Sequence, residues 1–211
     1  MTLRFAATED VVAGRRALPP ALRALYVHRG RIAVARGGAR TTLRENECRL
    51  FTGVVTLEGE GEAWGFELAP PGMAEDPARI VLAQTLRLDP AAPILLRVDR
   101  VDFPAGAVTP RHGHAGPGIR RLLFGQLSAE IGPTLRRIDP GQAWFEPGDA
   151  PVVGRNLAPA SAFLRGMLLD PTLRGETSFR AWTEADAERP RGVAYAIFLD
   201  EVVRIPPGAA P

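Results

Sequence analysis

The chain reads as a series of short segments with the period of β-strands. Residues 94–103 alternate apolar and polar side chains, as a half-buried strand does, and residues 25–34 are also strand-like. A Gly-Gly pair at 37–38 predicts a hairpin, and residues 45–47 predict a turn. Further short strands are expected at 49–51, 54–57, 63–68 and 80–82, with a Pro/Gly-rich loop over 70–78 and short helical turns at 9–18 and 20–24.

The second half of the chain repeats the first with a shift of 95 residues. The residues that coincide are those that suit tight turns, since glycine and asparagine best tolerate a positive φ. These coinciding pairs are Gly30 with Gly125, Gly37 with Gly132, Gly53 with Gly148, and Asn46 with Gly141. The repeat predicts two similar β units that join near residues 86–93.

The repeat divides the chain into three segments: residues 1–88, residues 89–171, and a tail of residues 172–211. The tail is expected to begin with a short helix whose N-cap is Thr183, and to end in a strand. Residues 197–208 resemble residues 95–106, which open the second unit. We therefore expect the strand within residues 196–208 to complete the sheet of the first unit, in its own chain or in a partner chain.

Composition supports a chain of many short strands. Glycine (22) and proline (20) are spread over all 211 residues, which favours tight turns over a disordered tail. Long helical bundles are excluded because no stretch of about 15 residues both lacks helix breakers and keeps an apolar period of 3.6. The one cysteine, Cys48, allows no intramolecular disulfide and is expected to be a small buried residue.

Charge and hydropathy limit the partners. The 26 basic residues are all arginines, but they are interleaved with 24 acidic residues, so no nucleic-acid footprint is expected. No apolar run approaches the roughly 20 residues that span a bilayer, and the N-terminus does not read as a secretory signal. We expect a cytoplasmic protein with neither membrane nor nucleic acid as a partner.

The segment that carries chemistry is residues 106–114, where His112 and His114 stand two positions apart. On a strand, such residues point to the same face, and two neutral imidazoles there can bind one metal ion. A chance surface loop is the alternative. The third histidine, His28, has no such neighbour and is expected to be structural.

This stretch resembles the first motif of the cupin family, which runs glycine, five residues, His-x-His, three or four residues, glutamate, six residues, glycine. The second cupin motif, with glycine, proline, histidine and asparagine, is similar to residues 141–156. The residues that match the two motifs in spacing are Gly106, His112, His114, Gly125, Gly141, Pro147 and Asn156. The resemblance implies an all-β fold of two cupin-type double-stranded β-helix (jelly-roll) barrels with a few short helices, that is, a bicupin.

The resemblance fails at two metal ligands. Gly118 stands where the first motif has glutamate, and Val152 stands where the second has histidine. Glu146 is the candidate replacement, because a carboxylate there would give a set of two histidines and one carboxylate with open positions. It can also face solvent or pair with an arginine. A divalent ion (zinc, iron, manganese or nickel) is the cofactor that the resemblance implies.

Three other residues are candidates for ligand binding. Arg120 is two residues beyond Gly118, so it is expected to share the inward face and bind an anion, although a surface or salt-bridged position is equally open. Gln126 and Trp144 are further candidates for lining the site, and for Trp144 core packing is the default.

Two functions remain open. The first is a metal-dependent enzyme, such as a dioxygenase or an isomerase, which uses His112, His114 and Glu146 with a small anionic ligand. The second is a non-catalytic small-molecule-binding or structural barrel that lacks a stable metal. Exposed sheet edges would allow a homodimer.

Overall fold

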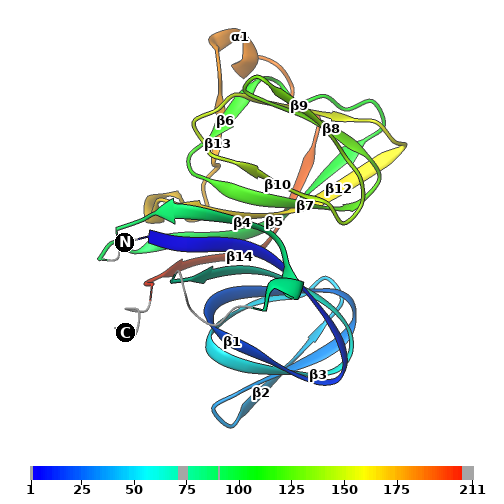
Figure 1. Cartoon of the computed structure of the whole chain (residues 1–211). Coiled ribbons are helices and arrows are strands. Elements are labelled where there is room, and N and C mark those ends of the chain that lie inside the picture. The colour runs from blue at the N-terminus through cyan, green and yellow to red at the C-terminus, as the bar shows by residue number, and fades with distance from the viewer. Residues whose placement is uncertain (1, 71–75, 90, 206–211) are drawn as a thin grey trace. The chain divides into compact units, whose positions relative to one another are not determined.

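The computed structural model describes residues 2–70, 76–89 and 91–205, and its regular structure is almost entirely antiparallel β-sheet (Figure 1). The chain divides into two compact units. The first contains Met1–Ala92 with Arg204–Pro211, and the second contains Pro93–Val203. In the part of the chain that the structure describes, no helix is long and apolar enough to cross a membrane.

The first unit is built from two long strands that bend on themselves. β1 (Thr2–Arg36) pairs with β3 (Cys48–Ala69), and the shorter β2 (Ala39–Arg44) and β4 (Ile80–Arg87) pair with β1. Residues 22–26 of β1 face two parts of β3 at once, 48–52 and 64–68. This double pairing closes the sheet, and the 3-10 helix η1 (Pro77–Arg79) leads into β4.

The expected helical turns at 9–18 and 20–24 are wrong, because both segments belong to β1. Pairing with β3 satisfies their backbone groups and overrides the local preference of this stretch for helix. The expected hairpin at Gly37–Gly38 and the turn before Cys48 are confirmed. Cys48 itself is half-buried.

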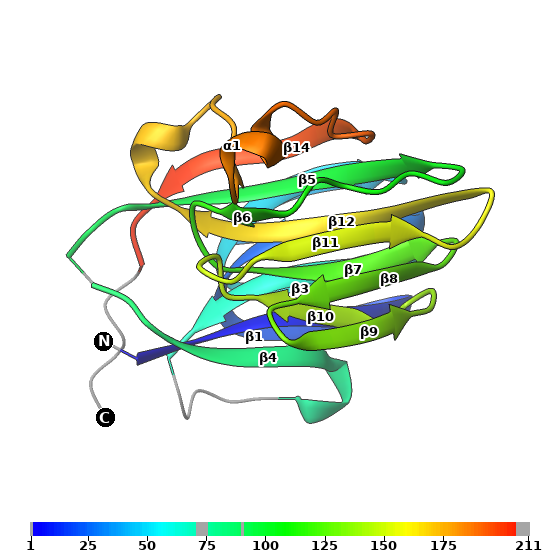
Figure 2. The ribbon, with the colours of Figure 1, turned by 90° about the horizontal axis from the view of Figure 1, so that it is seen from above.

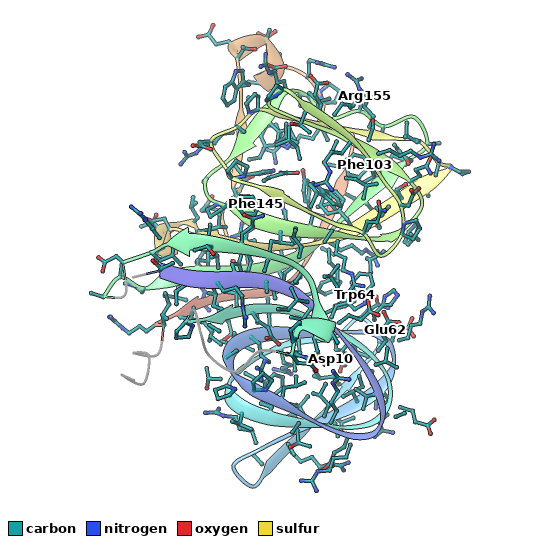
Figure 3. All side chains as sticks on the ribbon, viewed as in Figure 1. Asp10, Glu62, Trp64, Phe103, Phe145 and Arg155 are labelled. Carbon is teal, nitrogen blue, oxygen red and sulfur yellow. The ribbon has the colours of Figure 1, made fainter. Side chains whose placement is uncertain are left out.

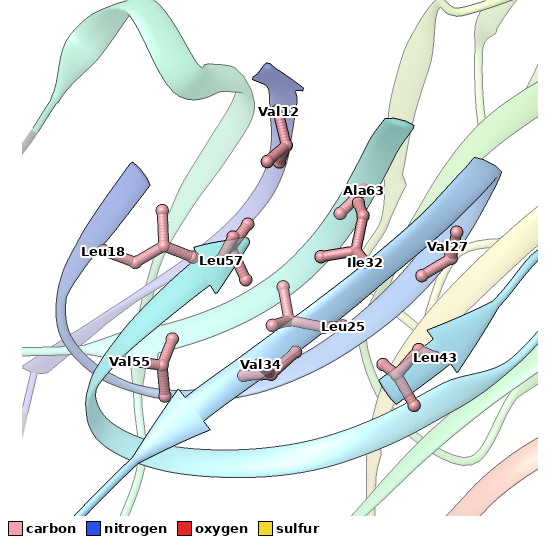
Figure 4. Close-up of a cluster of buried hydrophobic side chains, with 10 residues drawn as sticks. All are labelled: Val12, Leu18, Leu25, Val27, Ile32, Val34, Leu43, Val55, Leu57 and Ala63. Carbon is pink, nitrogen blue, oxygen red and sulfur yellow. The ribbon is translucent and has the colours of Figure 1, made fainter. Parts of the chain in front are cut away.

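The interior of the first unit is apolar. Figure 4 shows ten buried aliphatic side chains from β1, β2 and β3 packed together, against which Phe51 also packs. A buried ion-pair network lies elsewhere in this unit. Arg79 binds Asp10 through two hydrogen bonds of 2.7 and 2.8 Å and contacts Glu67 at 2.7 Å, while Arg23 contacts Glu67 at 3.1 Å (Asp10 is labelled in Figure 3). These charges compensate one another, so the network is structural.

The second unit is a jelly roll of two five-stranded sheets. The first has the order β10-β7-β12-β5-β14, which can be followed in Figure 2, and the second has the order β13-β6-β11-β8-β9. Apolar residues from both sheets form one core between them. The strands are β5 (Ile94–Pro104), β6 (His112–His114), β7 (Gly118–Phe124), β8 (Leu127–Ile131), β9 (Thr134–Ile138), β10 (Ala143–Glu146), β11 (Val152–Asn156), β12 (Ala160–Leu169), β13 (Phe179–Ala181) and β14 (Ala194–Val203).

Two short helices lie between β12 and β14. They are η2 (Pro171–Leu173) and α1 (Glu184–Ala187). The Thr183 side chain accepts a hydrogen bond from the backbone N–H of Asp186, which confirms Thr183 as the N-cap.

The repeat of the sequence is visible in the backbone. Every one of the coinciding turn residues has a positive φ, including Asn46 at 64° opposite Gly141 at 82°. The register also repeats, since Leu25 pairs with Arg49 in the first unit and Arg120 pairs with Trp144, 95 residues later, in the second. The two units are therefore built on the same local plan.

The C-terminal strand differs from expectation. β14 pairs with β5 along its length, so it extends a sheet of the second unit rather than the first. Its Leu199 and Val203 are buried, and Asp200 binds Arg97 of β5 through oxygens at 2.8 and 3.1 Å. These contacts fix the strand beside the segment whose sequence it resembles.

Candidate functional site

One cavity of the second unit contains five of the six residues singled out from the sequence. His112 and His114 come from β6, Arg120 from β7, and Trp144 and Glu146 from β10. All five are buried, with Arg120 completely inaccessible to solvent. The cavity walls are otherwise mostly apolar, and include Phe103, which is labelled in Figure 3 inside this barrel.

The Glu146 carboxylate is the centre of the polar cluster. Its Oε1 accepts a hydrogen bond of 2.8 Å from Trp144 Nε1. Its Oε2 lies 2.7 Å from Arg120 Nη2 and 3.3 Å from His114 Nε2. Of the two orientations considered for Glu146, the structure shows the inward one, and the carboxylate is paired with an arginine.

The electrostatics of this cluster make Glu146 an anion and both histidines neutral. Burial alone would raise the pKa of Glu146, but the Arg120 charge and the hydrogen bonds from His114 and Trp144 together hold it below its ordinary range. Burial lowers the pKa of His114 to about 3, and also lowers that of His112. Burial lowers the pKa of Arg120 to about 10, so its guanidinium stays charged at neutral pH.

The neighbours fix where each imidazole carries its proton. His112 Nδ1 lies 2.8 Å from the Pro110 carbonyl, which can only accept, so Nδ1 carries the proton and Nε2 is an acceptor. His114 Nε2 faces an ionised carboxylate, so it carries the proton and Nδ1 is the acceptor. His114 Nδ1 and Arg120 Nε are buried without a hydrogen-bond partner in the structure. Unpaired buried groups of this kind are costly unless a water or a ligand meets them.

Gly118 explains how Arg120 fits. A Cβ on Gly118 would come within 2.8 Å of Arg120 Nη1 and 2.7 Å of the Gly166 carbonyl oxygen. The position where the cupin motif has glutamate therefore has no side chain because the guanidinium occupies that space.

Arg165 and Tyr195 belong to the cavity wall but were not expected from the sequence. Arg165 of β12 binds Asp99 of β5 through two hydrogen bonds of 2.9 and 2.7 Å, and its guanidinium lies 5.6 Å from the Tyr195 ring centroid. A signal was available: Arg165 interrupts the apolar run 162–169, and a charge in such a run indicates a buried pair.

Gln126 does not line the cavity. Its side-chain amide donates to Asp139 Oδ1 at 2.7 Å, so it holds the end of β9 rather than a ligand. His28 of the first unit stacks on Trp64 at 4.2 Å between ring centroids (Trp64 is labelled in Figure 3).

The described residues of the first unit contain no counterpart of this polar cluster. Ala17 and Pro19 stand there 95 residues before His112 and His114, and Leu25 takes the place of Arg120. Phe51, 95 residues before Glu146, packs on the same apolar core. Among the residues that the structure describes, the repeat therefore carries this candidate site in its second copy and not in its first.

The donor set does not fit the divalent ion that the resemblance implies. Among the described residues, no group of three or more His, Cys, Asp or Glu side chains is placed to hold a metal. Both oxygens of Glu146 are already engaged. An ion about 2.1 Å from Oε2 would lie within about 5 Å of Arg120 Nη2, where like charges repel in a buried site.

No family model matches the sequence, and no curated protein matches it. Among solved structures, AerE from Microcystis aeruginosa is similar with a TM-score of 0.59 and 15% identity, over 80% of this chain and 88% of that one. Salicylate 1,2-dioxygenase from Pseudaminobacter salicylatoxidans gives 0.55 and 12%, over 90% and 74%. A cupin 2 conserved barrel domain protein from Leptotrichia buccalis gives 0.49 and 11%, over 77% and 81%. With the sheets described above, the likenesses to AerE and to salicylate 1,2-dioxygenase show the fold: the chain is built of cupin-type jelly-roll barrels.

Proposed function

We propose that the second unit is a small-molecule-binding barrel that works without a divalent ion, and that its cavity takes an uncharged, hydroxyl-bearing part of a small ligand. This is the second of the two functions left open by the sequence. The observation that carries it is the pair of buried, unpartnered atoms in one cavity: Arg120 Nε, a donor, and His114 Nδ1, an acceptor.

Charge balance favours an uncharged group of the ligand in this cavity. Arg120 is paired with Glu146, and Arg165 is paired with Asp99, while both histidines are neutral. An anion placed beside them would be a buried charge without a counter-ion, unless it displaced Glu146. The anionic ligand expected from Arg120 alone therefore gains no support from this cluster.

Hydrogen bonding and size favour a hydroxyl group. A hydroxyl can donate to one imidazole nitrogen and accept from Arg120 Nε, whereas an apolar group would leave both atoms unsatisfied. The free volume of about 30 Å³ is larger than the roughly 10–15 Å³ that one water requires, but it is small. It suits the end of a molecule, with the apolar walls in contact with its carbon atoms.

The three histidines of the chain make the test direct. Long-range ¹H–¹⁵N spectra of the imidazoles report each ring separately, and His28 serves as an internal control because it lies in the first unit. We expect 2-propanol to shift the signals of His112 and His114 while acetate leaves them in place. Equimolar Zn²⁺ should leave the signals of His112 and His114 unchanged, and none of the three probes should shift the signals of His28.

Two results would overturn the proposal. Stoichiometric shifts of His112 and His114 by Zn²⁺ would return the site to a metal centre. No response to 2-propanol at saturating concentration, with the imidazole tautomers as assigned above, would show that the cavity takes no hydroxyl ligand.

A further inference from the structure

A second cavity of the same unit lies next to the first. Its volume is about 200 Å³, several times that of the inner cavity, and we call it the outer cleft. Arg165 and Tyr195 line both spaces, so one wall separates them. Tyr195 is 41% exposed, which places part of this wall in contact with solvent.

The Phe179 ring contacts one residue of each space. The ring stacks on His112 of the inner cavity, with 4.7 Å between the ring centroids and 18° between the ring planes. The Arg191 guanidinium of the outer cleft also lies 4.3 Å from the centroid of this Phe179 ring. The His112 ring and the Arg191 guanidinium are therefore at most 9.0 Å apart.

Of the three arginines that line the outer cleft, two are paired with carboxylates and one, Arg191, is not paired with any that the structure describes. Arg97 is paired with Asp200 and Arg165 with Asp99, so neither offers a free charge. Arg191 donates to the Thr177 hydroxyl at 3.3 Å and has no carboxylate within ion-pair distance among the described residues. Glu176 also lines the cleft, and its carboxylate would oppose an anion there.

The segment between the two spaces is weakly attached. Within residues 91–205, no backbone hydrogen bond joins residues 190–193 to the rest of the chain. Val193 of this segment lines the inner cavity, and Arg191 lines the outer cleft. Residues 190–193 therefore contribute a wall residue to each space while few backbone contacts hold them in place.

We infer that the binding site extends past the Arg165–Tyr195 wall into the outer cleft, where Arg191 binds a carboxylate, so that the ligand is a small hydroxy acid. This inference rests on the proposed function, because the hydroxyl end of the acid is the group that enters the inner cavity. It moves the expected anion from Arg120, which Glu146 occupies, to Arg191, which has no counter-ion of its own. An arginine–carboxylate contact beside an aromatic ring is a favourable geometry for such recognition.

Three probes of equal chain length separate the two parts of the site. They are 4-hydroxybutyrate, 1-butanol and butyrate, and binding is followed through the imidazole signals of His112 and His114. We expect 4-hydroxybutyrate to bind about two- to fivefold more tightly than 1-butanol, the value of one ion pair at an exposed arginine. Butyrate should bind most weakly at the imidazoles, because it has no hydroxyl group for them.

Variants of the outer cleft supply matched controls. Arg191→Gln should remove the advantage of 4-hydroxybutyrate and leave 1-butanol unchanged. Arg189→Gln, two residues away and facing Asp186 rather than the cleft, should change neither. Glu176→Gln should act in the opposite direction and tighten binding of the hydroxy acid, because it removes the opposing charge.

The outcomes distinguish this inference from the proposed function. If 1-butanol binds and 4-hydroxybutyrate gains nothing, or gains equally in Arg191→Gln, the inference is overturned and the proposed function stands. If neither alcohol nor hydroxy acid moves the imidazole signals, both are overturned.

Discussion

Arg120 determines the chemistry of the cavity at the level of single residues. A fully buried guanidinium needs a counter-ion, and Glu146 provides it at 2.7 Å while Trp144 holds the other carboxylate oxygen. The absence of a side chain at Gly118 leaves the required space. These residues form one unit, so a change at any of them is felt by the others.

A double-mutant cycle tests this interdependence. Arg120→Leu and Glu146→Phe introduce the residues that the first unit has at the corresponding positions, Leu25 and Phe51. Each single variant leaves an unpaired buried charge and should lower the free energy of unfolding by about 3–5 kcal/mol. The double variant should lose far less than the sum, because no charge remains. Urea unfolding measures all four proteins, and additive losses would contradict the pairing.

Because His114 is buried as a neutral imidazole, the free energy of unfolding should decrease as the pH falls. Burial lowers its pKa to about 3, whereas in the unfolded chain it has an ordinary value of about 6.5. Between these values the unfolded state binds more protons, so stability is retained above pH 6.5 and lost as the pH falls toward 3. The wild type should lose about 2 kcal/mol between pH 6.5 and 4.5 through this group. In His114→Gln, the loss of unfolding free energy between pH 6.5 and 4.5 should be smaller than in the wild type by that amount. The control variant, His28→Gln, should lose as much as the wild type.

At the level of elements, the turns are the feature that could be predicted most directly from the sequence. The coincidence of glycines and of Asn46 with Gly141 depends on backbone conformation alone, and all these positions have a positive φ. Strand β1 could not be predicted over residues 2–24, because the partner that holds them, β3, is distant in the chain. The inward direction of Arg120 followed from strand periodicity, whereas its partner Glu146 required the register of β7 against β10.

Alanine variants of two glycines with a positive φ can separate the cost of backbone strain from the cost of a steric clash. Gly132 has a φ of 54° and open space around an added Cβ, so Gly132→Ala should cost about 1 kcal/mol of stability. Gly125 has a φ of 81°, and a Cβ there would lie 2.3 Å from the Ala160 carbonyl oxygen. Gly125→Ala should cost about 3 kcal/mol or more, since backbone must move. Thermal unfolding of both variants checks the order, and equal losses would show that the close approach is relieved without cost.

At the level of the whole molecule, the two units use one backbone plan for two interiors. In the first unit the plan holds a cluster of apolar side chains (Figure 4), and in the second it holds a cavity with the Arg120–Glu146 ion pair. Strand register and turn positions therefore do not specify the site; the side chains at a few inward positions do. The motif spacing located the histidines, but whether they form a metal centre depended on Arg120 and Glu146, which the spacing does not address.

Truncation tests which unit depends on the C-terminal strand. A chain that ends at residue 193 lacks β14, with its pairing to β5, the Asp200 contacts to Arg97, and Tyr195 of the cavity wall. Hydrogen exchange should then accelerate in β5 and around residues 175–179, while β1 and β3 keep their protection. A chain that ends at residue 203 keeps β14 and should retain protection in β5, which separates the strand from the residues that follow it. Loss of protection in β1 and β3 with β5 unaffected would instead assign the strand to the first unit, as the sequence echo suggested.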